Sequence, residues 1–371
     1  MSGLAVATPQ YVASNDDAAF PFLTGVSFYS VAPDGSLTFV ERVQTGGYGI
    51  GGGFFGTNRL SVLDSGNQQC VYASEASTGD IVGISVNTLT VGGSATGSPT
   101  DGGTSNGIGL AMNSQYLYAS FTDSNTIGTF QVKPGCSLAF VNDVSVGGLA
   151  GGIVNGMAIH GSILIATYTD GSIESFDISA GAPVSHGDKQ YSTATLNSQD
   201  ATYPNSIDIT SDGHYAIFGD TSTSVVVEVS DISSGKLTPT VVHTSKASIS
   251  SSNVMLSPDE TLLWVINTQG DAVSVIYFSK TTGALSGGCT SGRLRGLSVN
   301  WSYLAGMGLA SQMGNGGGVY VAEYGTTSGV ALVSLTISGQ KCSLQEAKKS
   351  PFVDAGSPGL LSIGTFPPRS F

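Results

Sequence analysis

The sequence predicts an all-β fold, a seven-bladed β-propeller built from four-stranded blades. Three observations carry this prediction: a strand pattern that returns about every 50 residues, strand-like alternation inside each copy, and chain ends that supply two parts of one blade. A small sheet of this size can bury its faces only against neighbouring copies, which favours a closed ring. We therefore expect residues 1–371 to form a single domain.

The recurring unit is a short apolar strand, often with a tyrosine, that ends in a polar loop. Its seven copies, in chain order, are residues 11–14, 71–74, 117–120, 164–167, 216–219, 263–266 and 319–322. We assign each copy to the second strand of a blade. The aromatic side chains of Tyr72, Tyr118, Trp264 and Tyr320 are predicted to pack in the core rather than to form a ligand platform.

The fifth copy shows the expected order of elements within a blade. Residues 207–209 form the inner strand, and Ser211-Asp212-Gly213 is a turn signal before the second strand. Residues 225–230 alternate as a third strand should, and residues 237–243 form the outer strand. The same order predicts four strands in every blade.

The two ends of the chain predict how the ring closes. The chain begins with a second strand at residues 10–14 and ends with an inner strand at residues 359–364. Together they would complete one blade from both termini. Closure of this kind removes the exposed sheet edges of an open array.

Composition excludes some partners and suggests a location. The net charge of −13 argues against nucleic acid, and no apolar run is long enough for a membrane-spanning helix. The first residues lack the basic and apolar regions of a signal peptide. The scarcity of lysine nevertheless favours an extracellular or cell-surface protein, with the signal removed from this chain.

Four cysteines, Cys70, Cys136, Cys289 and Cys342, are even in number and allow three pairings. Pairing in chain order, Cys70 with Cys136 and Cys289 with Cys342, would link adjacent blades. Disulfides would agree with an extracellular location, whereas a cytosolic protein would keep these thiols free.

A ligand site in a propeller would be formed by loops at one end of the channel. Four asparagines occupy equivalent positions before inner strands, Asn58, Asn106, Asn155 and Asn205, at spacings of 48, 49 and 50 residues, and Ser252 follows. Four carboxamides at one level could bind a carbonyl, a hydroxyl or water. The alternative is that each asparagine shapes the turn into its strand.

Acids recur in the loops that follow the second strands. They are Asp16, Asp17, Glu75, Asp123, Asp170, Asp220 and Glu323, with Asn267 in the equivalent place of the sixth blade. A negative funnel would suit a small polar or cationic ligand, and Ca²⁺ is the metal that oxygen ligands would favour. Otherwise no cofactor is predicted. The alternative is that these acids complete tight turns.

The layout resembles the lactonase-type propellers, the family of carboxymuconate cyclases and phosphogluconolactonase-like proteins. The similar elements are Ser257-Pro258-Asp259-Glu260 and the outer turns Ser234-Gly235-Lys236-Leu237 and Thr282-Gly283-Ala284-Leu285. The resemblance implies a seven-bladed ring and hydrolysis of lactones.

The resemblance also implies His and Arg, often as Pro-Arg-His, where the chain turns into the inner strands. Here those positions read Ser105-Asn106-Gly107 and Pro204-Asn205-Ser206, and only Asn58-Arg59 has an arginine. The four histidines fall on the opposite face or on outer strands. No catalytic residue is therefore carried over.

Two functions follow from these patterns. The first is a non-catalytic secreted or cell-surface propeller that acts as a binding module or self-assembling scaffold, with itself as a partner. The alternative is a lactonase-like or cyclase-like hydrolase with an atypical site, in which the four asparagines and Glu75 polarise the substrate and one carboxylate acts as a base.

Overall fold

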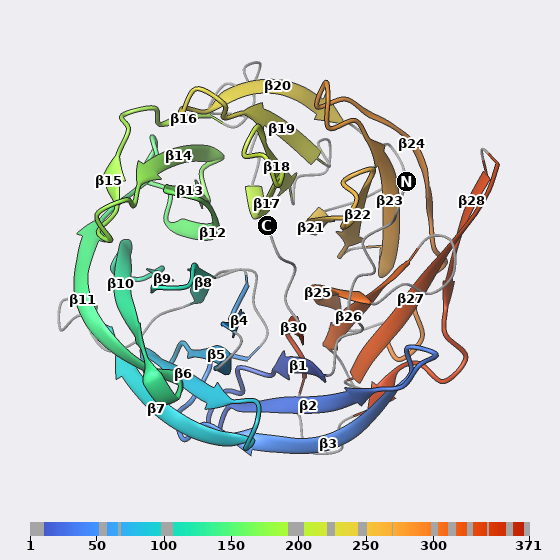
Figure 1. Ribbon diagram of the computed structural model, residues 1–371, viewed down its shortest axis with the longest axis horizontal. Coiled ribbons are helices and arrows are strands. Elements are labelled where there is room, and N and C mark those ends of the chain that lie inside the picture. The colour runs from blue at the N-terminus through green and yellow to red at the C-terminus, as the bar shows by residue number, and fades with distance from the viewer. Residues whose placement is uncertain are drawn as a thin grey trace.

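The computed structural model describes residues 11–51, 58–65, 68–97, 107–191, 204–220, 227–243, 251–268, 270–297, 303–310, 317–324, 329–339, 341–353 and 359–366. In this part of the chain, seven antiparallel sheets stand around a central axis, and Figure 1 shows them as a ring. The predicted seven-bladed β-propeller is confirmed.

Each blade takes its strands in chain order from the axis to the rim. Blade two is β4 (Leu60–Asp64), β5 (Gln69–Glu75), β6 (Asp80–Ser85) and β7 (Thr90–Thr96); blade three is β8 (Ile108–Met112), β9 (Tyr116–Phe121), β10 (Thr126–Lys133) and β11 (Ser137–Ser145). Blade four is β12 (Val154–His160), β13 (Ile163–Tyr168), β14 (Ser172–Asp177), β15 (Val184–Ser185) and β16 (Gln190–Tyr191).

The remaining blades repeat the order. Blade five is β17 (Pro204–Ile209), β18 (Tyr215–Asp220), β19 (Val227–Asp231) and β20 (Thr238–His243); blade six is β21 (Ser251–Leu256), β22 (Leu262–Asn267), β23 (Ala272–Phe278) and β24 (Leu285–Thr290). Blade seven is β25 (Tyr303–Ala310), β26 (Gly318–Tyr324), β27 (Gly329–Ser338), β28 (Lys341–Glu346) and β29 (Phe352–Val353).

Blade one closes the ring from both ends of the chain, as predicted. β30 (Ser362–Phe366) is its inner strand, followed by β1 (Tyr11–Asn15), β2 (Gly25–Val31) and β3 (Leu37–Gln44). β1 and β30 pair in antiparallel register, with Tyr11 opposite Phe366. The hydroxyl of Ser14 donates to the carbonyl of Ser362 at 2.8 Å, which adds a side-chain bond to this closing pair.

The hydrophobic core lies between blades rather than within them. Each of seven buried clusters joins side chains of two neighbouring blades, so each sheet face is covered by the next sheet. Tyr72, Tyr118, Trp264 and Tyr320 are all buried, which confirms their predicted place in the core.

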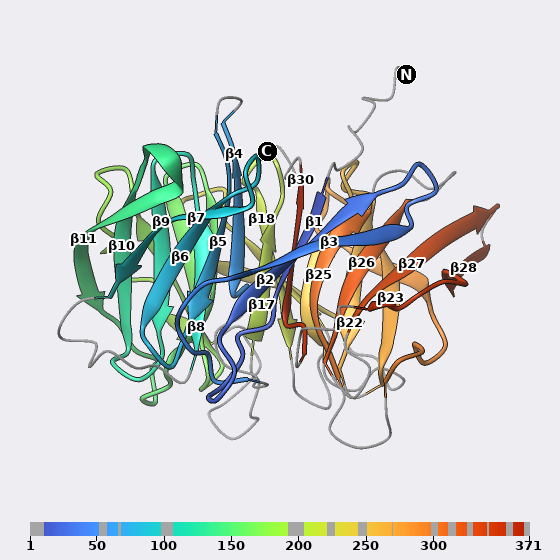
Figure 2. The same cartoon turned by 90° about the horizontal axis from the view of Figure 1, so that it is seen from below.

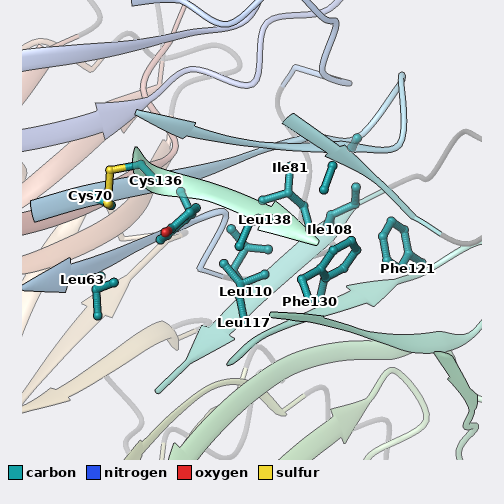
Figure 3. Close-up of a cluster of buried hydrophobic side chains, with 14 residues drawn as sticks. Leu63, Cys70, Ile81, Ile108, Leu110, Leu117, Phe121, Phe130, Cys136 and Leu138 are labelled. Carbon is teal, nitrogen blue, oxygen red and sulfur yellow. A yellow bond between two sulfur atoms is a disulfide. The ribbon is translucent and has the colours of Figure 1, made fainter. Parts of the chain in front are cut away.

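Two disulfides join adjacent blades, and of the three possible pairings the structure has the one in chain order. Cys70 of β5 is bonded to Cys136, which follows β10, and Cys289 of β24 is bonded to Cys342 of β28. Figure 3 shows the first bond at the edge of the cluster between blades two and three. Each bond therefore reinforces an interface that is already packed.

Every blade has the predicted four strands, and blades four and seven each carry one additional short strand. β16 pairs with β14, and β29 pairs with β27, so each of these sheets has a fifth strand of two residues. In blade four the outer strand β15 is equally short. Glu174 compensates by accepting a hydrogen bond from Ser185 and pairing with Lys189 at 3.0 Å, which fastens the rim segment to β14.

Candidate functional site

The starts of the inner strands and the ends of the second strands lie at the same end of the ring, which we call the mouth face. The strand register shows this directly: Pro204 pairs with Asp220, and Ser251 pairs with Asn267. Figure 2 shows the strands of all blades running between this face and the opposite one. The polar positions predicted from the repeat therefore share one face.

The asparagine positions coincide with irregularities of the inner strands. The register shifts around Asn155, Asn205 and Ser252, so an extra residue stands at the same point in three blades. β-bulges of this kind are common next to active sites, because they redirect side chains. The side chain of Asn155 is buried, with 3% exposure.

The other asparagines differ in what the structure describes. Asn58 is half-buried and has a φ of 57°, a left-handed conformation that asparagine tolerates better than most residues. Asn106 and the side chain of Asn205 lie outside the described residues. A ring of four carboxamides stays a prediction.

A buried ion pair lies directly beside Asn58. Arg59 Nη1 is 2.6 Å from Asp17 Oδ2, and it also donates to the carbonyl of Gly51 at 3.0 Å. Burial raises the pKa of Asp17 to about 6, against the opposing charge of Arg59. The pair joins the end of the second strand of blade one to the start of the inner strand of blade two.

A second pair stands next to the first. Asp16 Oδ2 is 2.5 Å from Arg42 Nη2, and burial raises the pKa of Asp16 although Arg42 lowers it. Both described arginines of this region are therefore committed to a neighbouring carboxylate.

Glu75 holds the glycine-rich linker that runs from blade one to blade two. Its Oε1 accepts a hydrogen bond from the Gly47 N–H at 2.8 Å. A Cβ on Gly47 would lie 2.4 Å from Glu75 Oε2, and one on Gly49 would lie 2.0 Å from the Asp17 carbonyl oxygen. A side chain at position 49 would collide with the backbone of Asp17, and one at position 47 would displace the carboxylate of Glu75.

Asp170 has the same role for the linker between blades three and four. Its Oδ2 accepts hydrogen bonds from the backbone of Ala150 at 2.7 Å and of Gly152 at 3.1 Å. Burial alone would raise the pKa of Asp170, but the hydrogen bond from the hydroxyl of Ser172, together with these backbone bonds, holds it below its usual value. The sequence prediction considered turn formation for these acids but missed this contact with the preceding linker.

The remaining predicted acids have different surroundings. Asp123 is exposed in the turn between β9 and β10, and the side chain of Asp220 lies outside the described residues. Glu323 is fully buried, and burial raises its pKa to about 9, with Glu346 and Asp271 adding to the shift. The predicted acids of the mouth face therefore differ in their surroundings: Asp123 is exposed, Glu323 is buried, and Asp17 is buried and paired with Arg59.

A serine, a histidine and an aspartate meet on blade four, where the sequence predicted no site. Ser175 Oγ is 2.9 Å from His186 Nδ1 and 2.5 Å from Asp188 Oδ2. The aspartate binds the serine rather than orienting the imidazole, and Ser175 is only 1% exposed. This arrangement lacks the order of an activated nucleophile.

No group of three or more His, Cys, Asp or Glu side chains is arranged to hold a metal ion in the described part of the chain. Its helical segments include none with the length and apolar character needed to cross a bilayer.

Comparison with solved structures shows the same fold in proteins of similar length. A Bacteroides fragilis protein proposed to be a 6-phosphogluconolactonase is 14% identical, with a TM-score of 0.71 and coverage of 96% of this chain and 98% of that one. A similarly described protein of Bacteroides uniformis is 12% identical, with a TM-score of 0.67 and coverage of 96% and 99%.

A third similar structure is named as a gluconolactonase. The periplasmic gluconolactonase of Pseudomonas aeruginosa is 14% identical, with a TM-score of 0.60 and coverage of 77% of this chain and 83% of that one. Identities this low establish the shared fold alone. No curated protein sequence matches the chain.

The sequence of the chain also matches a protein-family model. A family model described as "Lactonase, 7-bladed beta-propeller" matches residues 70–298, which is more than half of the chain. The match runs from the second strand of blade two to the end of blade six and agrees with the seven sheets of the structure. This chain therefore belongs to the lactonase family of seven-bladed β-propellers.

Proposed function

We propose that this chain is a lactone hydrolase with its site on the mouth face, around Asp17, Asn58 and Arg59. The observation that carries the proposed activity is the family match over residues 70–298. The proposed site lies before the matched residues and rests on the buried Asp17–Arg59 pair. The match favours the hydrolase alternative over the non-catalytic scaffold that we expected first from the sequence, for which neither the family match nor the fold comparison offers support.

Hydrolysis of a lactone needs a base and a stabiliser of negative charge. The base takes a proton from water, the water oxygen bonds to the acyl carbon, the ring C–O bond breaks, and the proton passes to the ring oxygen. Charge develops on the carbonyl oxygen, where hydrogen-bond donors lower the barrier. The only product is the hydroxy acid.

Asp17 is the candidate base, Asn58 is the candidate donor, and Arg59 positions Asp17. A carboxylate with a pKa of about 6 is mostly ionised at neutral pH and is still basic enough to accept a proton. Asn58 adjoins Arg59 in the chain and is partly exposed. Asp17 and Arg59 are buried beneath the linker of residues 45–51, so we propose that this linker opens for the substrate.

The charge of the site favours an uncharged lactone. Arg42 and Arg59 are both paired with carboxylates, and the whole chain has a net charge of −13. Recognition of a phosphate or carboxylate group would need a cation that is not already committed. We therefore expect an uncharged sugar lactone to be preferred over its phosphorylated form.

The test is acid release from glucono-δ-lactone and from its 6-phosphate, followed in a pH-stat above the spontaneous rate. Asp17→Asn should lower kcat/KM by about 100-fold or more, since it removes the base. Asp34→Asn, in the exposed turn between β2 and β3, is the matched control and should retain full activity. Equal rates for the wild type and Asp17→Asn, no turnover of any lactone, or preference for the phosphate would contradict the proposal.

We also propose that the protein works outside the cell. The support is the pair of disulfides, which persist in oxidising compartments. Self-association remains a prediction from composition, which a sizing column run at several protein concentrations would test.

A further inference from the structure

Tyr324 is the last residue of β26 and lies at the mouth face on the side of blade seven that meets blade one. Tyr320 and Ala322 of the same strand belong to a buried cluster that also contains Val12 and Tyr29 of blade one. Side chains alternate along a strand, so Tyr324 continues this face. Its side chain is half-buried, unlike those of Tyr320 and Ala322, which are fully buried.

Two glycines define where the side chain of Tyr324 lies. A Cβ on Gly359 would be 2.3 Å from Cδ2 of Tyr324, so the ring lies directly against the segment that leads into β30. A Cβ on Gly51 would be 3.8 Å from the hydroxyl oxygen of Tyr324. The side chain therefore extends from blade seven across the start of blade one, and its hydroxyl reaches the end of the linker that enters blade two.

Gly51 also contacts both residues of the buried ion pair. Its N–H donates to the carbonyl of Asp17 at 2.8 Å, and its own carbonyl accepts from Arg59 Nη1 at 3.0 Å. The side chains of Asp17 and Arg59 are 2.6 Å apart. The hydroxyl of Tyr324, the carboxylate of Asp17 and the guanidinium of Arg59 are thus gathered around Gly51 from three different blades.

The position of a side chain at Gly51 is open among the described residues. A Cβ there would meet Ala19 Cβ at 3.6 Å and the Tyr324 hydroxyl at 3.8 Å, which are ordinary contact distances. At Gly47 and Gly49 of the same linker, a Cβ would lie only 2.4 Å and 2.0 Å from its neighbours. The space beside Gly51 can therefore accept a small group, and the hydroxyl of Tyr324 forms part of its wall.

We propose that Tyr324 is a further catalytic residue, whose hydroxyl donates a hydrogen bond to the carbonyl oxygen of a lactone bound beside Gly51. This inference rests on the proposed function. Negative charge develops on that oxygen as water attacks the acyl carbon, so the bond is stronger in the transition state than in the bound substrate. A phenol donates without carrying a charge, and it keeps its proton throughout the reaction. It therefore suits an uncharged lactone at a site whose arginine is already paired with Asp17.

The first test removes only the hydroxyl. Tyr324→Phe keeps the ring against Gly359, so its Tm should match that of the wild type. Its kcat for glucono-δ-lactone should fall about 100-fold, with a much smaller change in KM, because a donor to the developing charge is lost. Tyr277→Phe is the matched control, since this half-buried tyrosine pairs with Leu262 at the opposite face, and it should retain full activity. Equal kcat values for the wild type and Tyr324→Phe would overturn the proposal and leave the hydrolase itself in place.

The second test measures binding without turnover. Glucono-δ-lactam keeps the ring and the carbonyl of the lactone, and its affinity can be measured by calorimetry. Tyr324→Phe should bind it about 2–10-fold more weakly than the wild type, the range expected for one hydrogen bond. This loss of affinity in a protein that hydrolyses no lactone would support the hydrogen bond and contradict only the proposed activity. No binding of the lactam to the wild type, or equal affinities for the two proteins, would overturn the inference.

Discussion

Asp17 and Arg59 form a buried ion pair, at 2.6 Å, that crosses from blade one to blade two. Arg59 also receives structural support from the closing strand, since its backbone N–H donates to the hydroxyl of Ser362 in β30 at 3.0 Å. The proposed site and the closure of the ring therefore share a residue. A change at Arg59 is expected to affect both.

The pH dependence of activity should report Asp17. A carboxylate acts as a base only when ionised, so kcat/KM should rise through a pH of about 6 and then level off. The measurement is the initial rate of lactone hydrolysis between pH 4.5 and 8. A profile with no ionisation near 6 would exclude Asp17 as the base.

The raised pKa of Asp17 should make stability fall as the pH rises, whereas activity should rise with pH. The folded protein holds the Asp17 proton more tightly than the unfolded chain, whose aspartate pKa is about 4. The contribution of this group is therefore greatest below pH 4 and is lost as the pH rises through about 6, by about 3 kcal/mol for a shift of this size.

Urea unfolding of the wild type and of Asp17→Asn at several pH values checks this expectation. The free energy of unfolding of the wild type, relative to the variant, should fall between pH 4 and 6. Asp34→Asn, which alters an exposed acid, should leave that pH dependence in place. Parallel curves for the wild type and Asp17→Asn would contradict the prediction.

Gly47→Ala should destabilise the ring. The new Cβ would lie 2.4 Å from the carboxylate of Glu75, so the linker or the acid has to move, at a cost of about 1–3 kcal/mol. Gly292→Ala is the control, because a Cβ there meets no atom within 4 Å. Similar unfolding free energies for both variants would show that the linker adapts without cost.

Loss of the inner strand of blade one should destabilise the whole protein. A chain that stops after Ser357 lacks β30, which leaves β1 with an unpaired edge and removes its contact with blade two. We expect one cooperative unfolding transition at a much lower temperature. A synthetic peptide of residues 359–366 should restore part of the loss, whereas a separate transition for a single blade would argue against a closed ring.

Removal of one disulfide by Cys70→Ser with Cys136→Ser should lower stability by about 2–4 kcal/mol, since the bond closes a loop between residues 66 positions apart. Peptide mapping without reduction should recover the Cys70–Cys136 and Cys289–Cys342 pairs from the wild type. Thiols that react with a labelling reagent in the native protein would contradict both bonds.

The repeat was enough to predict the number of blades and the closure by both termini, whereas the disulfide pairing stayed open among three possibilities. The number of blades and the closure depend on spacing along the chain, which a sequence displays. The contact between Glu75 and Gly47 was not predictable in the same way, because it joins a loop of one blade to a linker from the preceding blade. The sequence shows the glycine-rich stretch that includes Gly47, but it does not show that Glu75 binds this stretch.

Blade four shows the same limit. Its outer strand has only two residues, Val184 and Ser185, and side-chain contacts of Glu174 with Ser185 and Lys189 hold this part of the rim. Alternation of apolar residues predicts strands, but it does not reveal that side-chain contacts replace backbone pairing at the rim. The bulges at Asn155 and Asn205 also required the register, although the spacing had placed these residues at equivalent points.

The register of the closing pair has a mechanical consequence. Tyr11 and Phe366 face each other at one end of β1 and β30, and Asn15 and Ser362 face each other at the other. A force that pulls the two chain ends apart at Tyr11 and Phe366 would load the backbone hydrogen bonds one after another, as in a zip, rather than all together. The ring would thus resist heat as one cooperative unit yet open at low force from its own termini.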